Sequence, residues 1–176
     1  MDSMESAIKF ALEKLQKDVE LKKEQRKTVE LLVKDRKDVL AILPTGFGKS
    51  LIFHILPFVF DFIEEGGQPD STVIVISPLN GLIRDQIDKL KTVLNVCVLN
   101  INGFSFSEVS SDGDDKGSER FDGAGAVDHS RSCQLVFAHP EVFVNNRKVI
   151  NKIVHIEFYF VDENFYCAYK RCKGCC

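Results

Sequence analysis

The stretch Leu43-Pro44-Thr45-Gly46-Phe47-Gly48-Lys49-Ser50 lies between two apolar segments, residues 38–42 before it and a longer one that begins at Leu51. Its two glycines let the backbone curl so that successive N–H groups can point at one anion. A helix that follows such a loop adds its own free N–H groups and its dipole. A strand, a glycine-containing loop and a helix in this order predict a phosphate-binding loop.

The polar residues of this loop have the chemistry that a nucleotide requires. Lys49 can place its ammonium against the β- and γ-phosphates, and Ser50 can offer its hydroxyl to Mg²⁺. The strict pattern has glycine where this chain has Leu43, so a chance match in a surface loop is the alternative, which the flanking strand and helix patterns disfavour. The loop residues expected to bind ATP are Thr45, Gly46, Phe47, Gly48, Lys49 and Ser50.

The composition is that of an ordinary globular domain. The chain has 176 residues, of which 44% are hydrophobic and 28% charged, which is enough for one domain with its own core. A net charge of −3 argues weakly against a nucleic-acid partner, although one local surface can still bind a strand. We find no secretory signal and no apolar run long enough to cross a bilayer, so we expect a reducing intracellular compartment and no membrane partner.

Hydrophobic periodicity predicts alternating helices and strands. The alternation implies an α/β fold with a parallel sheet flanked by helices and right-handed crossovers, with the phosphate loop at the carboxyl edge of the sheet. Pro57 is expected to kink or break its helix. The expected helices are residues 4–17, 24–33, 49–64, 79–92 and 142–152, the expected strands are 39–43, 72–77, 96–99, 135–138 and 156–161, and residues 66–70 are expected to form a turn.

Two segments differ in composition from the rest. Residues 100–132 are rich in Ser, Gly and Asp and are interpreted as a flexible acidic insertion. Residues 164–176 form a Cys-rich tail, for which we considered two interpretations. One is a zinc knuckle, and the other is a tail that arises from truncated or alternative coding and belongs to no domain. The adjacent thiols fit a tetrahedral site poorly, so the second interpretation is favoured. The four thiols of the tail are Cys167, Cys172, Cys175 and Cys176, while Cys97 and Cys133 are interpreted as small buried hydrophobes.

An apolar strand at residues 158–161 ends in two adjacent carboxylates, Asp162 and Glu163. In a site that hydrolyses a nucleotide, the first carboxylate can hold Mg²⁺ and the second can orient or deprotonate the attacking water. Acidic residues after a strand are usually a solvated turn. The pairing with a phosphate loop favours the catalytic interpretation here.

Four segments taken in order resemble one family. Gln25 precedes the loop by one helix and one strand, residues 75–86 have the form VxSPLxxLxxDQ, residues 136–141 end a strand in a Pro-Glu pair, and residues 161–163 read Val-Asp-Glu. Together with the loop, they resemble the first motor lobe of a RecQ-type DNA helicase within the DEAD/DEAH helicase superfamily. The resemblance covers roughly residues 20–163 apart from the insertion. It implies a RecA-like P-loop lobe that is truncated at its carboxyl end and preceded by an N-terminal helix within residues 1–20.

The resemblance also implies roles for particular residues. Gln25 would recognise the adenine edge, with Lys22 flanking the base, although a solvated helix position is the alternative for Gln25. The residues implied to contact a DNA strand are Ser77, Pro78, Arg84 and Gln86, for which turn and helix-start chemistry is an equally good explanation. The implied catalytic residues are Lys49, Asp162 and Glu163, and the implied Mg²⁺ contacts are Ser50 and Asp162.

By this resemblance the function would be that of an ATP- and nucleic-acid-binding lobe of a 3′–5′ DNA helicase that cannot unwind DNA alone. It would use ATP and Mg²⁺, act on single-stranded or forked DNA, and work with a second helicase lobe or a partner protein. A nuclear location follows from the family, with the cytoplasm as the alternative. Asn164-Phe165 replaces the Ala-His expected after the acidic pair. This departure favours a catalytically inactive fragment that binds a nucleotide or a partner and regulates a full-length helicase, whereas a small nucleotide kinase is the least favoured alternative.

Overall fold

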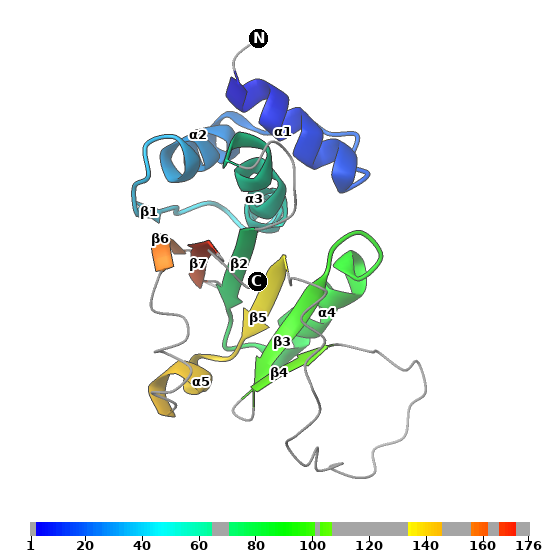
Figure 1. The fold of residues 1–176 in the computed structure, drawn as a ribbon, viewed down its shortest axis with the longest axis vertical. Helices are drawn as coiled ribbons and strands as arrows, with labels where there is room; N and C mark the ends of the chain where they lie inside the picture. The colour runs from blue at the N-terminus through cyan, green and yellow to red at the C-terminus, as the bar shows by residue number, and fades with distance from the viewer. Residues whose placement is uncertain are drawn as a thin grey trace.

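The structure of the chain is a computed structural model, which describes residues 3–64, 71–100, 103–106, 134–145, 156–161 and 166–171. Helices and strands alternate along most of the described chain, as the periodicity predicted (Figure 1). The helices are α1 (Ser3–Lys14), α2 (Lys23–Val33), α3 (Lys49–Glu64), α4 (Asn80–Leu90) and α5 (Pro140–Asn145). The strands are β1 (Val39–Leu40), β2 (Ser71–Ile76), β3 (Val96–Asn100), β4 (Gly103–Phe106), β5 (Leu135–Ala138), β6 (Ile156–Val161) and β7 (Tyr166–Arg171).

All seven of these strands belong to one sheet, in the order β1-β6-β7-β2-β5-β3-β4. Strands β2, β5 and β3 run parallel to one another, and β1 runs parallel to β6. The predicted α/β fold, with helices flanking a parallel sheet, is therefore confirmed for this part of the chain. The sheet as a whole is mixed, however, because β4 and β7 are antiparallel to their neighbours.

Strand β7 lies where the sequence predicted a tail unrelated to any domain. It pairs with β2 from Ser71–Arg171 to Ile76–Tyr166, and its other edge pairs with β6. It therefore joins the β1–β6 pair to the rest of the sheet. The run Tyr-Cys-Ala-Tyr at residues 166–169 contains two aromatic residues, which favour strands. Interpreting the segment by its cysteines alone missed this propensity.

Strand β4 lies within the predicted acidic insertion and pairs with β3, with Cys97 opposite Phe106 and Asn100 opposite Gly103. Its sequence, Gly-Phe-Ser-Phe, alternates an aromatic residue with a small one, which is a strand pattern. The acidic composition of the longer stretch concealed these four residues. The rest of the insertion, at residues 101–102 and 107–132, lies outside the described residues.

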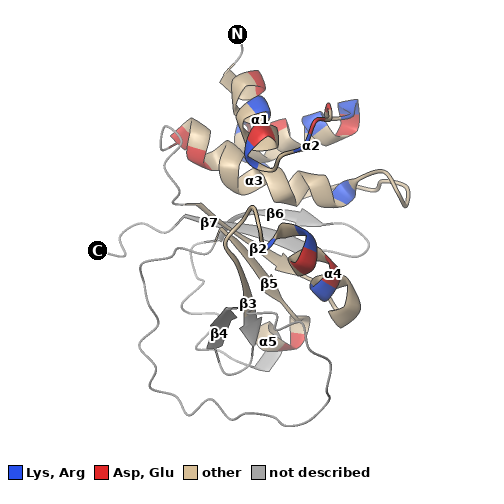
Figure 2. Ribbon diagram, turned by 90° about the vertical axis from the view of Figure 1, so that its right-hand side faces the viewer, with Lys and Arg blue, Asp and Glu red and all other residues tan. Residues whose placement is uncertain are grey.

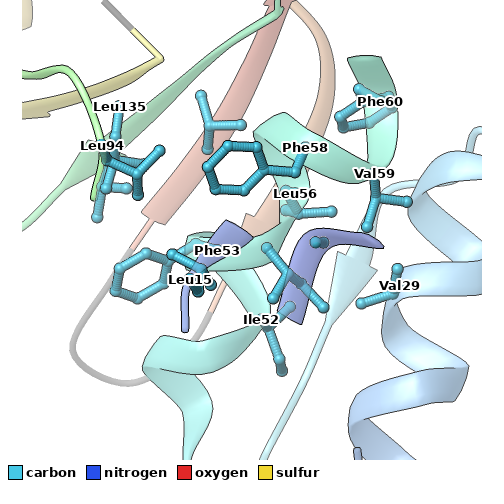
Figure 3. Packing of buried hydrophobic residues seen from close by; sticks show 14 of the residues in the cluster. Leu15, Val29, Ile52, Phe53, Leu56, Phe58, Val59, Phe60, Leu94 and Leu135 are labelled. Carbon is cyan, nitrogen blue, oxygen red and sulfur yellow. The ribbon is translucent and has the colours of Figure 1, made fainter. Parts of the chain in front are cut away.

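The main core lies between one face of the sheet and α1, α2, α3 and α4 (Figures 1 and 3). On β2 and β5, alternate residues face this core, including Val73 and Phe137. The residues between them, such as Ile74 and Val136, form a smaller cluster on the opposite face, where Val142 of α5 covers them. This alternation is the period of two that a strand imposes. Apolar side chains of α3 dominate the main core, and those labelled in Figure 3 are Ile52, Phe53, Leu56, Phe58, Val59 and Phe60.

Two local expectations are corrected. Helix α3 continues through Pro57, so the break that was one of the two outcomes expected there is absent. Pro57 has no N–H to donate to the preceding turn, but the helix buries apolar residues around most of its circumference, and this packing outweighs one lost hydrogen bond. Cys97 is buried as expected, but its sulfur is disulfide-bonded. The expected turn at residues 66–70 and the end of the expected helix, at residues 146–152, lie outside the described residues.

Candidate nucleotide-binding site

The predicted phosphate loop connects the end of β1 to the first residue of α3, Lys49. Both of its glycines have the left-handed backbone conformation, with φ of 77° at Gly46 and 89° at Gly48. The loop begins with a tight turn in which Phe47 N donates to Pro44 O at 3.1 Å. The strand–loop–helix arrangement expected from the sequence is therefore present, with the glycines at the positions that need their conformational freedom.

The two glycines differ in their surroundings. A Cβ atom added to Gly48 would lie 2.8 Å from Gln25 Nε2, closer than real Cβ contacts allow. A Cβ atom added to Gly46 would meet no other atom within 4 Å. Gly46 is therefore favoured by its backbone angle alone, whereas a Cβ at position 48 would also force the end of the Gln25 side chain to move.

This difference predicts unequal costs for two alanine substitutions. Gly46→Ala should lower the free energy of unfolding by about 1–2 kcal/mol, the strain of a left-handed residue with a side chain. Gly48→Ala should cost more and should displace the Gln25 amide as well. Urea unfolding of both variants measures the difference, with Gly81→Ala in α4 as an open-space control. Equal losses at positions 46 and 48 would show that the contact with Gln25 has no energetic importance.

Residues at the start of α2 contact the loop from outside. Gln25 is only 2% exposed, and its Nε2 donates to Phe47 O at 3.2 Å and to Gly48 O at 2.9 Å. Its Oε1 accepts from Lys22 N at 2.8 Å. Lys22 Nζ also donates to Phe47 O at 3.1 Å and lies 4.2 Å from the centroid of the Phe47 ring. The structure thus places Gln25 at the phosphate loop, with both amide hydrogens directed at loop carbonyls.

Lys49 begins α3 with its side chain folded toward the start of the loop. Its side chain is 9% exposed, and Nζ donates to Leu43 O at 3.0 Å. Ser50 follows in the same helical turn and is partly buried, whereas Thr45 is exposed. The loop therefore contains an ammonium group, a hydroxyl group and a helix start in one place. This is the set of groups that binds a polyphosphate together with Mg²⁺.

Asp162 and Glu163 lie outside the described residues. The strand that leads to them does lie within the described chain, since β6 ends at Val161. In the parallel pairing of β1 and β6, Val161 lies opposite Leu40, three residues before the phosphate loop begins. The strand before the acidic pair and the strand before the loop therefore end at the same edge of the sheet, as the sequence led us to expect.

The four residues predicted to contact a DNA strand fall into two groups. Pro78 and Arg84 are exposed. Ser77 is 0% exposed, and its Oγ accepts from Leu79 N at 3.3 Å, which is the turn chemistry considered as its alternative. Gln86 is 4% exposed and lies between α4 and α3, where its Oε1 is 2.8 Å from His54 Nε2. Only Pro78 and Arg84 thus present side chains to a partner in this structure.

His54 is a buried polar residue that the sequence interpretation left without a role. Burial lowers the pKa of His54 to about 4, although its hydrogen bond with Gln86 acts in the opposite direction. The imidazole is therefore neutral at pH 7, and the contact with an amide oxygen requires the tautomer with hydrogen on Nε2. A single His in an apolar run carries no signal by which the sequence alone could identify this partner.

Lys89 of α4 and Lys91, just after the helix, are each paired with an acidic residue of α4 (Figure 2). Lys89 Nζ lies 2.6 Å from Asp85 Oδ2, and Lys91 Nζ lies 3.0 Å from Asp88 Oδ1. Lysines can attract a nucleic-acid backbone, but these ion pairs reduce that attraction here.

Among the described residues, no helix is both long and apolar enough to cross a membrane. In that same part of the chain, no three His, Cys, Asp or Glu residues gather as metal ligands would. The cysteine side chains of the tail, for which a zinc knuckle was considered, lie outside the described residues.

A parallel sheet with a phosphate loop between a strand and a helix defines the class of P-loop α/β proteins. Residues 22–164 match the family of DEAD/DEAH box helicases, and the chain belongs to this family. It is 45% identical over 67 residues to the ATP-dependent DNA helicase hus2/rqh1 of Schizosaccharomyces pombe, which is 38% of this chain and 5% of that protein. It is 34% identical over 77 residues to the ATP-dependent DNA helicase RecQ of Bacillus subtilis, which is 43% of this chain and 12% of that protein.

A third relative is the ATP-dependent DNA helicase Q5 of Rattus norvegicus, with 41% identity over 78 residues, 44% of this chain and 7% of that protein. These relatives confirm the resemblance to RecQ-type helicases that the motifs indicated. The matched segments span only 5% to 12% of the length of the three relatives.

Proposed function

We propose that this chain is the ATP-binding first motor lobe of a RecQ-like 3′–5′ DNA helicase. The observation that carries the proposal is the loop between β1 and α3, with two left-handed glycines and Lys49 at the start of α3. This loop belongs to a chain of the DEAD/DEAH box helicase family, and the three relatives described above are DNA helicases by name. The match to the family supports the helicase activity, and the loop supports ATP as the ligand.

In this proposal, Lys49 moves from Leu43 O to the β- and γ-phosphates of ATP, because a phosphate oxygen is a far stronger partner for an ammonium than a neutral carbonyl. Ser50 contacts Mg²⁺, which would neutralise charge on the phosphates. Thr45 and the backbone N–H groups of the loop complete the contacts with phosphate. Asp162 would hold Mg²⁺ and Glu163 would activate water, at the sheet edge where β6 ends.

A DNA strand would pass beside the start of α4. Pro78 and Arg84 are exposed there, and Arg84 can pair with a backbone phosphate without recognising bases. Ser77 and Gln86 would act indirectly, by shaping the turn and by joining α4 to α3. We further propose that a second helicase lobe or a partner protein supplies the cation that stabilises charge on the transferred phosphate, so that this chain alone hydrolyses ATP slowly and unwinds no DNA. A nuclear location rests on the same family relationship.

The second candidate is a nucleotide-binding or partner-binding protein that regulates a full-length helicase without catalysis. The observation that favours it is Asn164-Phe165, which stands where the family pattern has Ala-His. The two candidates differ in hydrolysis. Phosphate release stimulated by single-stranded DNA would support the motor lobe, whereas tight binding of ATP with no release at all would support the regulator.

The experiment that tests the proposal is titration calorimetry with ATP and Mg²⁺. The wild-type chain should bind one ATP, and Lys49→Ala should weaken binding roughly 50-fold, because a charge-assisted contact with two phosphates is lost. Lys34→Ala, which removes an exposed lysine at the end of α2, is the matched control and should change nothing. Equal affinity in wild type and Lys49→Ala, or no binding in either, would contradict the proposal.

A further inference from the structure

Helix α2 has one face in the core and the opposite face in solvent. The buried face consists of Gln25, Thr28, Val29, Leu32 and Val33. The solvent face carries Lys23, Lys27 and Lys34, all of them exposed, and we refer to these three side chains as the lysine row. Lys34 is the C-cap residue, but its backbone keeps right-handed helical angles, with φ of −84° and ψ of −49°. Helical geometry therefore places the three lysines within about 40° of one another around the axis, over a length of about 16 Å.

The lysine row has no partner within the described part of the chain. No carboxylate there forms an ion pair with any of its three ammonium groups. By contrast, Lys89 and Lys91 are both paired. Arg26, at the edge of the same face of α2, is paired with Glu5 of α1. Residues 22–37 contain seven basic and three acidic residues, whereas the whole chain has a net charge of −3. The row is therefore an unneutralised positive surface on an acidic chain.

The solvent face of α2 offers charge without apolar contact area. A protein partner would need apolar or aromatic anchors at the centre of its interface, and a single nucleic-acid strand would need aromatic rings on which its bases stack. Helix α2 has no aromatic residue and none of the exposed large apolar side chains of the described chain, which are Val19, Leu40, Ile42, Ile63 and Leu79. A duplex presents its phosphates on the outside and requires only positive charges that follow them. The composition of this face therefore favours a duplex.

We propose that the lysine row binds the phosphate backbone of a DNA duplex without recognising its sequence. A row about 16 Å long can follow roughly five base pairs, since each base pair adds about 3.4 Å along the duplex. Lysine suits this contact, because its ammonium is a point charge that does not need the planar geometry of a base edge. The inference goes beyond the proposed function, since it adds a duplex contact on α2 to the strand contact proposed at Arg84. It does not require a bound nucleotide.

One acidic residue on the same face gives the proposal a test of opposite sign. Glu30 lies between Lys27 and Lys34 along the axis and about 20° from Lys23 around it, and it is partly buried. A carboxylate at this position repels a phosphate, so Glu30→Gln should strengthen duplex binding. A variant that damaged the fold would weaken binding instead. A gain in affinity therefore reports the charge of this face and not the stability of the chain.

The test is the affinity of the full chain, without nucleotide, for a blunt DNA duplex of about 20 base pairs, measured by fluorescence anisotropy between about 0.05 M and 0.2 M salt. Each change of a row lysine to glutamine should weaken binding roughly fivefold at about 0.1 M salt and should make the slope of log affinity against log salt shallower by about 0.9, the value for one phosphate contact. Glu30→Gln should strengthen binding roughly threefold. A duplex of scrambled sequence should give the same changes.

Lys14→Gln is the matched control and should leave duplex affinity unchanged. Lys14 is an exposed lysine in the last turn of α1, about 13 Å along that helix from Glu5, the residue that contacts α2 through Arg26. This distance exceeds the range of a screened charge at about 0.1 M salt.

Several results would overturn the proposal. They are no duplex binding by wild type, or an unchanged affinity and salt slope when all three row lysines are replaced by glutamine. Tighter binding of polyglutamate than of the duplex would instead assign the row to an acidic protein, and tighter binding of an RNA duplex would exclude DNA as its specific partner. Because no nucleotide is present, failure of this test is distinguishable from failure of the ATP site, which calorimetry measures separately.

Discussion

Replacing Phe53 with alanine is expected to lower the free energy of unfolding by about 4 kcal/mol, as typical for removing a fully buried aromatic ring. The Phe53 side chain is 0% exposed, and its ring lies edge-on to Phe137 of β5, with centroids 6.3 Å apart, and to His54, at 4.7 Å. It therefore joins the helix that follows the phosphate loop to the central strands (Figure 3). A cavity at this position would be enclosed by α3 and the sheet, which have little freedom to collapse into it.

Urea unfolding of wild type and Phe53→Ala measures this cost. The matched control is Phe10→Ala, which removes the same ring from a partly buried position in α1, where it packs against Phe62 with centroids 5.2 Å apart. We expect less than half the loss for Phe10→Ala, because a partly exposed site leaves no closed cavity. Similar losses in the two variants would contradict the central role given to Phe53.

Acidification from pH 6.5 to pH 4 is expected to lower the free energy of unfolding through His54, by about 3 kcal/mol. The pKa of His54 is lowered from 6.5 to about 4, chiefly by burial, partly offset by the hydrogen bond with Gln86 and reinforced by the charges of Lys17 and Lys89. The unfolded chain therefore binds a proton in this range that the folded chain does not. The contribution is fully present above pH 6.5 and is lost as the pH falls toward 4.

The measurement is urea unfolding at pH 7, 6, 5 and 4. His54→Gln keeps an amide that can contact Gln86 but cannot titrate, so its stability should depend less steeply on pH than that of wild type. Carboxylates contribute to both proteins alike, so the difference isolates His54. Parallel curves for wild type and His54→Gln would show that His54 does not titrate as expected.

The sequence predicted helices and strands correctly where a strong hydrophobic pattern coincided with burial. Helix α3 begins at Lys49 and ends at Glu64, as predicted, because a glycine-containing loop precedes it and its long apolar run is buried in the core. Strands β5 and β6 also have the predicted bounds. Strands β4 and β7 were missed, since each is a short aromatic-containing run inside a stretch whose acids or cysteines dominated the interpretation.

At the candidate site, the loop was predictable because its glycines and lysine are local in sequence. The contacts made by Gln25 were not, because the resemblance suggested a partner outside the chain, whereas the amide is used within it. Gln86 likewise appeared in a motif of strand-contacting residues, yet it lies buried against His54. A motif specifies residue types, but which side of a helix faces the core depends on packing between helices distant in sequence.

The position of β7 has a consequence for the order in which this chain can acquire its shape during synthesis on the ribosome. Residues 71–76 emerge first, but their neighbour on one side is residues 166–171, which are translated much later. Until then, no strand connects the β1–β6 pair to β2 by hydrogen bonds. Pairing between segments so far apart in sequence is slow, and the edge of β2 stays open in the meantime. Molecular chaperones that bind extended apolar segments would bind this open edge of β2 in the nascent chain.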